Sequence, residues 1–216
     1  MFFTFPIELN SDVSIMLNLI SKKTYNNVPG ETEFGCTYTL FDGQEVTFPY
    51  RIYYFDKYNR FSSLTFEQKM IYHCIFSRSY NGFVREKHIK AILEEDYPDW
   101  VFPYILKISD EYIIEILEIV YNELKNKNTD TLKSFCILNL QTFVRSYDRM
   151  ISYWNEYYRN QCFSYKDYIG NKLFSECFGY TESMEREYKR LTNNRQILLY
   201  QAVKTPTLCK FTEKAT

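Results

Sequence analysis

Residue types that bind anions gather in one segment, HCIFSRSYNGFVREKHIK, at positions 73–90. Arginine binds phosphate and carboxylate groups through paired hydrogen bonds, and the first turn of a helix offers free backbone amides to the same groups. Asn81–Gly82 favours a turn between two helices, which would bring their side chains together beside a helix start. The candidate anion-binding residues are Arg78, Arg85, His88 and Lys90. In the alternative interpretation these residues form a solvated helix face on which Glu86 pairs with Lys90.

Acid–base chemistry near neutral pH has few groups to use, because the chain contains only two histidines, His73 and His88. Cys74 follows His73 directly, and adjacent residues of a helix point about 100° apart, so the two are not a ready-made nucleophile–base pair. Cys74 also continues an apolar pattern, which favours structural burial. An enzyme built around either histidine would need a concave pocket where at least two polar groups converge near it.

Motifs of common enzyme and metal sites are missing from the sequence. There is no G-x-S-x-G, phosphate-binding loop, G-x-G-x-x-G or H-E-x-x-H, and the six cysteines include no C-x-x-C pair. Neither histidine follows a glutamate at the three-residue spacing of carboxylate metal bundles. The acidic run EEDYPD (94–99) is typical of a helix end entering a solvated turn rather than of two opposed catalytic acids. We expect no metal, no cofactor and no catalytic residue.

Aromatic residues are concentrated in RMISYWNEYYRNQCFSYKDYIG (149–170), where seven of 22 residues are Tyr, Trp or Phe. On a helix, Trp154 and Tyr158 would face inward, and their burial would contribute on the order of 3–5 kcal/mol. Tyr153 and Tyr157 would flank that side and face solvent. Tyrosine and arginine are favoured at protein interfaces. The predicted partner-binding residues are Arg145, Arg149, Tyr153, Tyr157 and Arg159.

The same surface could instead stack on the bases of single-stranded nucleic acid, at roughly 1–3 kcal/mol per base. Asp148, Glu156 and Asp167 dilute its positive charge, and the formal net charge of the whole chain is −1. The chain therefore lacks the global basic field of a general nucleic-acid binder. An AT-rich genome would also explain the 21 tyrosines among 216 residues. We expect core packing first, a protein partner second and base stacking third.

The N-terminal sequence MFFTFPIELNSDVSIMLNLI does not match a signal peptide, because no Lys or Arg precedes its apolar residues and Glu8 and Asp12 interrupt them. No run of about 18 apolar residues predicts a membrane span. Scattered cysteines in a chain of this size indicate reduced, mostly buried thiols. We expect a cytoplasmic protein without membrane association.

Residues 1–60 differ from the rest of the chain. A short helix is predicted there with Ser11 as its N-cap. CTYTLFDGQEVTFPYRIYYF then indicates a β-hairpin in which Asp42–Gly43 forms a two-residue turn. Pro49 cannot donate to a β-ladder, so the second strand ends there or lies at an edge. A lone hairpin is marginally stable in water, and it could pack on the helices of this chain or on another chain.

Helical periodicity dominates from Leu64 onward. Thr65 and Gln68 match a capping box at the start of one helix, and a second helix is predicted near 83–95. The strongest pattern, over 103–125, predicts one central helix that is apolar around most of its circumference. Its narrow polar stripe consists of Lys107, Glu111, Glu115, Glu118, Asn122 and Lys125.

Two further helices follow in the sequence. Apolar residues at spacings of three and four from Leu132 to Tyr158 predict one long helix. Thr181 then caps a charged helix that continues toward Val203. The last residues, TPTLCKFTEKAT, have the composition of a loose tail.

These elements predict a mainly α fold, a multi-helix bundle with a small N-terminal β-hairpin. The succession of helix pairs is similar to HEAT-like packing, although three similar units are not visible. The expected organisation is an N-terminal region at 1–60 packed on the rest, a helical domain at 61–204 and a flexible tail at 205–216.

The leading functional hypothesis is a bacterial-type protein-interaction protein without catalytic activity, such as an immunity protein, an inhibitor or an accessory subunit. The alternative is a helical protein that binds nucleic acid or a phosphate-bearing ligand through the candidate anion residues. An enzyme of unrecognised type around His73 or His88 is the third hypothesis.

Overall fold

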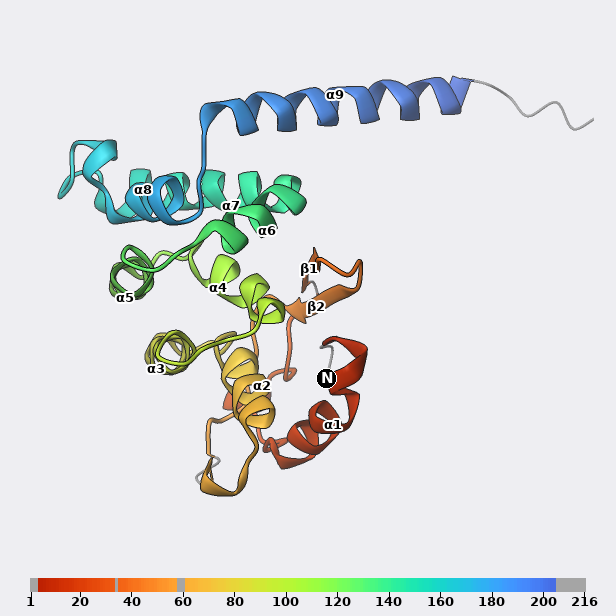
Figure 1. Ribbon diagram of the computed structural model, residues 1–216, viewed down its shortest axis with the longest axis vertical. Helices are drawn as coiled ribbons and strands as arrows, with labels where there is room; N and C mark the ends of the chain where they lie inside the picture. The colour runs from red at the N-terminus through yellow and green to blue at the C-terminus, as the bar shows by residue number, and fades with distance from the viewer. Residues whose placement is uncertain (1–3, 34, 58–60, 205–216) are drawn as a thin grey trace, which may run out of the picture. The chain divides into compact units, whose positions relative to one another are not determined.

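The computed structural model describes residues 4–33, 35–57 and 61–204. Over these residues the chain is mainly helical with a two-stranded antiparallel hairpin near the N-terminus, so the predicted fold class is confirmed (Figure 1). The chain forms two compact units, one that reaches to Tyr180 and one that begins at Thr181. The hairpin region therefore belongs to the same unit as the helices that follow it. The predicted tail at 205–216 lies outside the described residues.

The first unit contains, in chain order, α1 (Asn10–Leu19), β1 (Gly35–Thr39), β2 (Glu45–Pro49), α2 (Phe66–Phe76), α3 (Gly82–Leu93), α4 (Phe102–Ile108), α5 (Ile114–Leu124), α6 (Asp130–Leu138), α7 (Leu140–Tyr153) and α8 (Ile169–Lys172). Short 3-10 turns lie at Ile7–Leu9, Tyr25–Asn27, Phe61–Ser63, Asp99–Val101 and Tyr165–Asp167, and π-helical turns at Trp154–Tyr158 and Leu173–Cys177. The second unit contains α9 (Glu182–Lys204), the charged helix predicted after Thr181.

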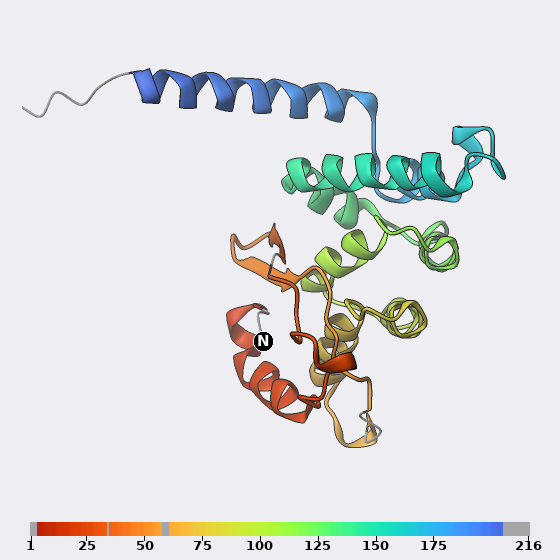
Figure 2. The same ribbon diagram turned by 180° about the vertical axis from the view of Figure 1, so that it is seen from behind.

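Helices α2 and α4 form the middle of the first unit. Helices α3 and α5 lie along one side of them, and α1 and the hairpin lie on the other side, as both views show (Figure 1 and Figure 2). Every residue of α4 is buried, which fits its place between two layers.

The hairpin has a three-residue turn, so the predicted two-residue turn is wrong. The Leu40 amide donates to the Gln44 carbonyl at 2.8 Å, which leaves residues 41–43 as the loop. Gly43 alone takes a positive φ, 86°, while Asp42 accepts a hydrogen bond from the Gln44 amide. Three-residue hairpin loops commonly end in a residue with left-handed backbone angles, and glycine adopts these angles without strain. Strand β2 ends at Pro49, as predicted.

The hairpin packs on the helices of its own chain. The Asn139 side chain accepts from the Thr39 amide at 2.8 Å and donates to the Thr39 carbonyl at 2.9 Å. One side chain thus pairs with both backbone groups of the last β1 residue, as a neighbouring strand would. On the hairpin's inner face, the Phe48 ring stacks on Tyr104 of α4 at 4.3 Å between centroids.

Ser11 is not the N-cap of α1, contrary to the prediction. The 3-10 turn Ile7–Leu9 runs directly into the helix, so α1 begins at Asn10 and Leu9 takes the cap position without a side-chain bond. The capping box of α2 is confirmed, because the Thr65 hydroxyl accepts from the Gln68 amide and the Gln68 side chain accepts from the Thr65 amide.

The predicted central helix is broken into α4 and α5, and residues 109–113 join the two. Two members of the predicted polar stripe are buried rather than exposed to solvent: Lys107 in α4 and Glu111 in the joining segment. Residues 103–125 therefore place charged side chains in the core instead of forming one continuous central helix.

The predicted helix from Leu132 to Tyr158 is also interrupted. Asn139 separates α6 from α7, and the chain after Tyr153 winds as a π-helix in which the Arg159 amide donates to the Trp154 carbonyl. A π-turn adds a residue per turn and rotates the side chains that follow out of the α-helical register. Trp154 and Tyr158, predicted to be buried, are half-exposed.

Candidate functional site

A buried carboxylate, Glu111, lies among three arginines. Its oxygens are 2.9 Å from Arg51 Nη1, 3.5 Å from Arg78 Nη1 and 2.8 Å from Arg85 Nε. The contact with Arg85 is an ion pair without the alignment of a hydrogen bond. Burial lowers the pKa of both Arg78 and Arg85, and the Glu111 charge opposes that effect. This cluster, the Glu111 cluster, holds three cations against one anion.

The segment between α2 and α3 positions these arginines. Its backbone pairs with Ile52, whose amide donates to the Arg78 carbonyl at 2.9 Å. Arg78 Nη2 then donates to the Tyr50 carbonyl at 2.7 Å, and Arg85 Nη1 donates to the Ser79 carbonyl at 2.8 Å. Backbone carbonyls thus satisfy donors that Glu111 does not reach.

The four predicted anion-binding residues do not meet at one point. Arg78 and Arg85 do face a carboxylate, but it belongs to the same chain and is buried with them. His88 is buried and faces Asp56, while Lys90 is exposed with its Nζ 4.0 Å from Glu94. Lys90 thus pairs with Glu94 rather than with the expected Glu86.

The two histidines lie in a hydrogen-bonded chain. His88 Nε2 is 3.0 Å from Asp56 Oδ2, and His88 Nδ1 is 2.8 Å from His73 Nδ1. Tyr72 and Lys87 also donate to Asp56, each at 2.7 Å. These bonds hold the pKa of Asp56 far below its usual range, although burial alone would raise it. The segment before α2 is thereby tied to both α2 and α3.

The charges of the groups in these hydrogen bonds determine which ring nitrogens of His73 and His88 carry protons. Burial, and then the proximity of His88, lowers the pKa of His73 to about 4, and burial also lowers the pKa of His88. At neutral pH the ionised Asp56 accepts from His88 Nε2–H, so His88 Nδ1 must accept from His73. The arrangement can pass a proton between His73 and His88. Neither histidine lines either of the two hollows described below.

Three tyrosines whose rings contact one another form a surface cluster, which we call the tyrosine face: Tyr112, Tyr153 and Tyr157. Ring centroids are 5.8 Å apart for Tyr112–Tyr153, 6.1 Å for Tyr153–Tyr157 and 6.0 Å for Tyr112–Tyr157. Tyr157 is 53% exposed and Tyr112 is 47% exposed. The Tyr158 hydroxyl donates to the Tyr112 carbonyl and so fastens the π-turn to residues 109–113. The rings of Tyr112 and Tyr157 are therefore exposed, as predicted for Tyr157, whereas Tyr153, also predicted to face solvent, is partly buried between them.

The predicted partner-binding residues are partly brought together. Arg149 Nη1 donates to the Tyr50 hydroxyl at 2.6 Å, beside Tyr153, whose pKa rises to about 12, mainly through burial and then through Tyr50. Arg159 instead lies over the Trp154 ring, 5.9 Å from its centroid. Arg145 is exposed on α7 and lines the pocket described next.

A hollow of about 340 Å³ lies between β1, the end of α4 and helix α7, and we call it the basic pocket. Lys107 Nζ donates to both oxygens of Asp110, at 2.9 and 2.6 Å, and Ser146 donates to Asp110 Oδ2 at 3.0 Å. The lining residues are Gly35, Cys36, Thr37, Tyr38, Lys107, Asp110, Thr142, Arg145, Ser146 and Arg149.

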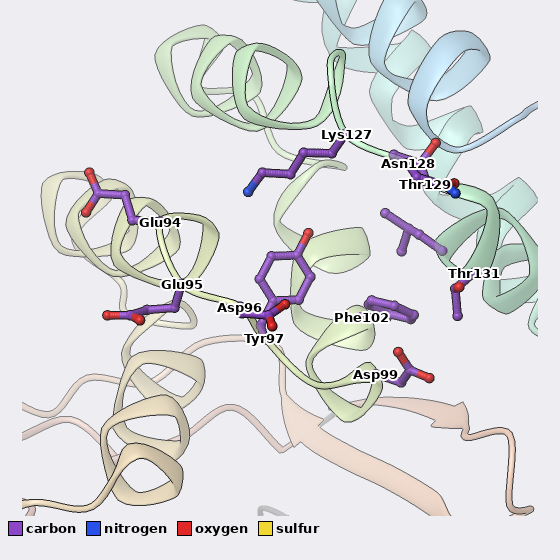
Figure 3. Close-up of a pocket in the computed structure, with 11 residues that line it drawn as sticks. Glu94, Glu95, Asp96, Tyr97, Asp99, Phe102, Lys127, Asn128, Thr129 and Thr131 are labelled. Carbon is purple, nitrogen blue, oxygen red and sulfur yellow. The ribbon is translucent and has the colours of Figure 1, made fainter.

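A second hollow, of about 430 Å³, contains the acidic run at 94–99 (Figure 3). Figure 3 shows Glu94 and Glu95 pointing away from the Tyr97 and Phe102 rings at its centre. Lys127 donates to the Leu93 carbonyl at 2.8 Å and closes one side. The two glutamates therefore do not face each other across the hollow, which is the arrangement expected of a solvated helix end.

Residues missed by the sequence predictions are Glu111 as an ion-pair partner, Asp56 and Tyr112. The run KISDE at 107–111 was a usable signal, because a lysine and two acids interrupt an otherwise apolar stretch. Charges inside a buried pattern indicate internal ion pairs. Asp56 and Tyr112 carried no local signal.

Among the described residues, no group of three or more His, Cys, Asp or Glu side chains is placed to share a metal ion. No helix in the part of the chain that the structure describes is both long and apolar enough to cross a bilayer. Comparisons with protein-family models, curated proteins and solved structures found no match for this chain.

Proposed function

We propose that this protein binds another protein through the tyrosine face and acts by binding rather than by catalysis. The observation that carries the proposal is the mutual ring contact of Tyr112, Tyr153 and Tyr157 while two of the three rings remain about half exposed. Tyrosine offers a large contact area at low entropic cost, so such clusters favour tight protein contacts.

Arg149 defines the chemistry of the partner. Its guanidinium stacks on Tyr50, 5.1 Å from the ring centroid, and its side chain is still 41% exposed. A partner that presents apolar groups to the tyrosines and a carboxylate to Arg149 would match both features. An immunity protein, an inhibitor or an accessory subunit of the bacterial cytoplasm acts by covering a partner in this way.

Burial of Arg78, Arg85 and His88 argues against nucleic-acid binding through the predicted anion residues, because phosphate contacts need cations that reach solvent. The hydrogen-bonded His73–His88 pair could serve acid–base chemistry only with a substrate pocket beside it.

Capture of partners from a nuclease-treated lysate of the native host tests the proposal. The variant Tyr157→Ser removes an exposed ring of the face, and Phe66→Ser is the matched control, since Phe66 is 41% exposed on α2. We expect one protein to be retained by the wild type and by Phe66→Ser and lost by Tyr157→Ser. Retention by Tyr157→Ser and by Tyr112→Ser alike, or no retained protein at all, would overturn the proposal.

A further inference from the structure

We propose that the outer edge of strand β1 binds an extended segment of another polypeptide, which adds to the hairpin as a third strand. The segment would lie in the basic pocket, between β1 and α7. The inference does not depend on the tyrosine face. It rests on the direction in which backbone groups of β1 point, not on the charge of the pocket.

The pairing of β1 with β2 determines which backbone groups point away from the hairpin. The Leu40 amide donates to the Gln44 carbonyl at 2.8 Å, so these two residues form a hydrogen-bonded pair. Hydrogen-bonded and non-hydrogen-bonded pairs alternate along an antiparallel ladder. In the register of this hairpin, Gly35, Thr37 and Thr39 therefore belong to non-hydrogen-bonded pairs. Their amides and carbonyls point away from β2.

Contacts with other segments support this assignment on both strands. On β2, the Thr47 carbonyl accepts from the Thr4 amide and the Thr47 amide donates to the Thr4 hydroxyl, each at 2.7 Å. On β1, the Asn139 side chain pairs with both backbone groups of Thr39. The chain thus supplies its own partners to one outward-facing residue of each strand, which is how proteins block exposed sheet edges.

The next outward-facing residue of β1, Thr37, is not blocked in this way. Its amide and carbonyl have no hydrogen-bond partner among the residues that the structure describes. The Thr37 hydroxyl lies 2.9 Å from the Thr47 hydroxyl, across the hairpin, and so does not cover the outer edge. Both Thr37 and Gly35 are exposed, so another polypeptide can reach them. An open edge of this kind pairs readily with an extended backbone.

The basic pocket lies along this open edge. Its lining includes four consecutive residues of β1, 35–38. Side chains of a strand alternate between its two faces, so consecutive residues line one hollow when the hollow follows the backbone edge. In both views β1 is the strand of the hairpin nearer to α6 and α7 (Figure 1 and Figure 2). The volume of about 340 Å³ is in the range of ligand-binding pockets.

Helix α7 forms the opposite wall and determines which side chains the segment can carry. Its lining residues Thr142, Arg145, Ser146 and Arg149 recur at i, i+3, i+4 and i+7, so they share one face of the helix. Hydroxyl and guanidinium groups match polar and acidic side chains. The occupant is therefore a segment whose backbone pairs with β1 and whose side chains toward α7 are polar or acidic.

The same wall argues against a second copy of this chain as the occupant. Pairing of two β1 edges would bring the partner's hairpin and the helices packed on it toward β1, where α7 bounds the space. A single extended segment needs only the spacing between neighbouring strands, about 4.8 Å.

Panning of a phage-displayed library of random linear peptides against the full-length protein tests the inference. Excess Thr37→Pro protein in solution removes peptides that do not need the outward-facing Thr37 amide, because proline has no amide hydrogen. Thr37→Pro should fold, since that amide takes no part in the β1–β2 ladder and Pro49 already occupies an outward-facing position opposite Gly35. Thermal unfolding verifies this.

Calorimetry of the selected peptides with defined variants separates backbone pairing from side-chain contact. Thr37→Pro should weaken binding about tenfold or more, through the loss of a hydrogen bond. Thr37→Val is the matched control, because it keeps the amide and loses only the hydroxyl, and its affinity should be within about twofold of the wild type.

Two measurements on the wild type need no variant, and they decide the question if Thr37→Pro does not fold. A selected peptide with methylated backbone amides has no donor for the Thr37 carbonyl, so it should bind about tenfold or more weakly. Hydrogen exchange of the Thr37 amide should slow when the unmodified peptide binds.

The inference would be overturned if no peptide were enriched, if the selected peptides bound Thr37→Pro and the wild type equally, or if exchange at Thr37 were unchanged. A wild-type dimer that Thr37→Pro dissociates would also overturn it, since the edge would then hold a second copy. Tyr157→Ser should bind the selected peptides normally, so failure of the proposed partner interaction and failure of the β1 edge are distinguishable.

Discussion

Arg85 Nε lies 2.8 Å from Glu111 Oε2, and both side chains are excluded from solvent. The pair joins the start of α3 to the segment between α4 and α5, which the sequence pattern assigned to a continuous helix. Glu111 lies in the segment after α4 ends at Ile108, and it is buried there. The Glu111 cluster therefore links the break between α4 and α5 to the packing of α3.

Glu111→Gln tests how strongly the fold depends on this carboxylate. The amide keeps the shape of the side chain but leaves three arginines without their neutralising anion. Loss of one partner of a buried ion pair costs about 3–5 kcal/mol, so we expect the free energy of unfolding to fall by that amount. Denaturant unfolding monitored by circular dichroism measures it.

Glu115→Gln is the control for this variant, because Glu115 is exposed on α5. It should change stability by less than about 0.5 kcal/mol. Equal stabilities for Glu111→Gln and Glu115→Gln would show that the arginines do not need Glu111.

Acidification should destabilise the folded state through His73. Its pKa falls from 6.5 to about 4 on folding, so the folded state binds its proton less well than the unfolded state does. Stability is therefore complete above pH 6.5 and declines as the pH falls from 6.5 to about 4, by on the order of 3 kcal/mol. Unfolding curves collected across this window measure the decline.

His73→Gln should flatten that decline, because glutamine does not titrate and can still hydrogen-bond to His88. Asp56 contributes its own loss at lower pH, since its pKa lies far below the usual range in the folded state. The two contributions thus separate along the pH axis. A slope between pH 6.5 and 4 that is the same in His73→Gln and in the wild type would contradict the assignment.

Asn139→Ala tests the docking of the hairpin. The substitution removes the partners of both the Thr39 amide and the Thr39 carbonyl, so we expect a loss of about 2 kcal/mol in the free energy of unfolding. Asn122→Ala, at an exposed position of α5, is the control. If the two variants were equally stable, the hairpin would not depend on Asn139 for its attachment.

Local signals were sufficient for much of the fold. Gly43 and Pro49 mark the hairpin, and Thr65 with Gln68 marks the start of α2, because turn and cap chemistry involves residues close in sequence. The breaks at residues 109–113 and at Asn139 were not predicted, since their sequences also fit amphipathic helices. Contacts with distant segments decide both, and periodicity cannot register such contacts.

The candidate site was predictable only where one element supplies it. Tyr153 and Tyr157 lie one turn apart on the same stretch of chain, so spacing alone grouped them. Tyr112 completes the tyrosine face from a segment far away in sequence, and Asp56 completes the histidine chain in the same way. A single sequence contains no signal for the contact of Tyr112 with Tyr153 or for that of Asp56 with His88.

The affinity of the captured partner for defined variants tests the central proposal most directly. By calorimetry, Tyr157→Ser should weaken binding by roughly 30-fold or more, about 2 kcal/mol, as expected for an aromatic residue near the centre of an interface. Phe66→Ser should bind within about twofold of the wild type. Wild-type affinity in both Tyr157→Ser and Tyr112→Ser would contradict the proposal that the tyrosine face holds the partner.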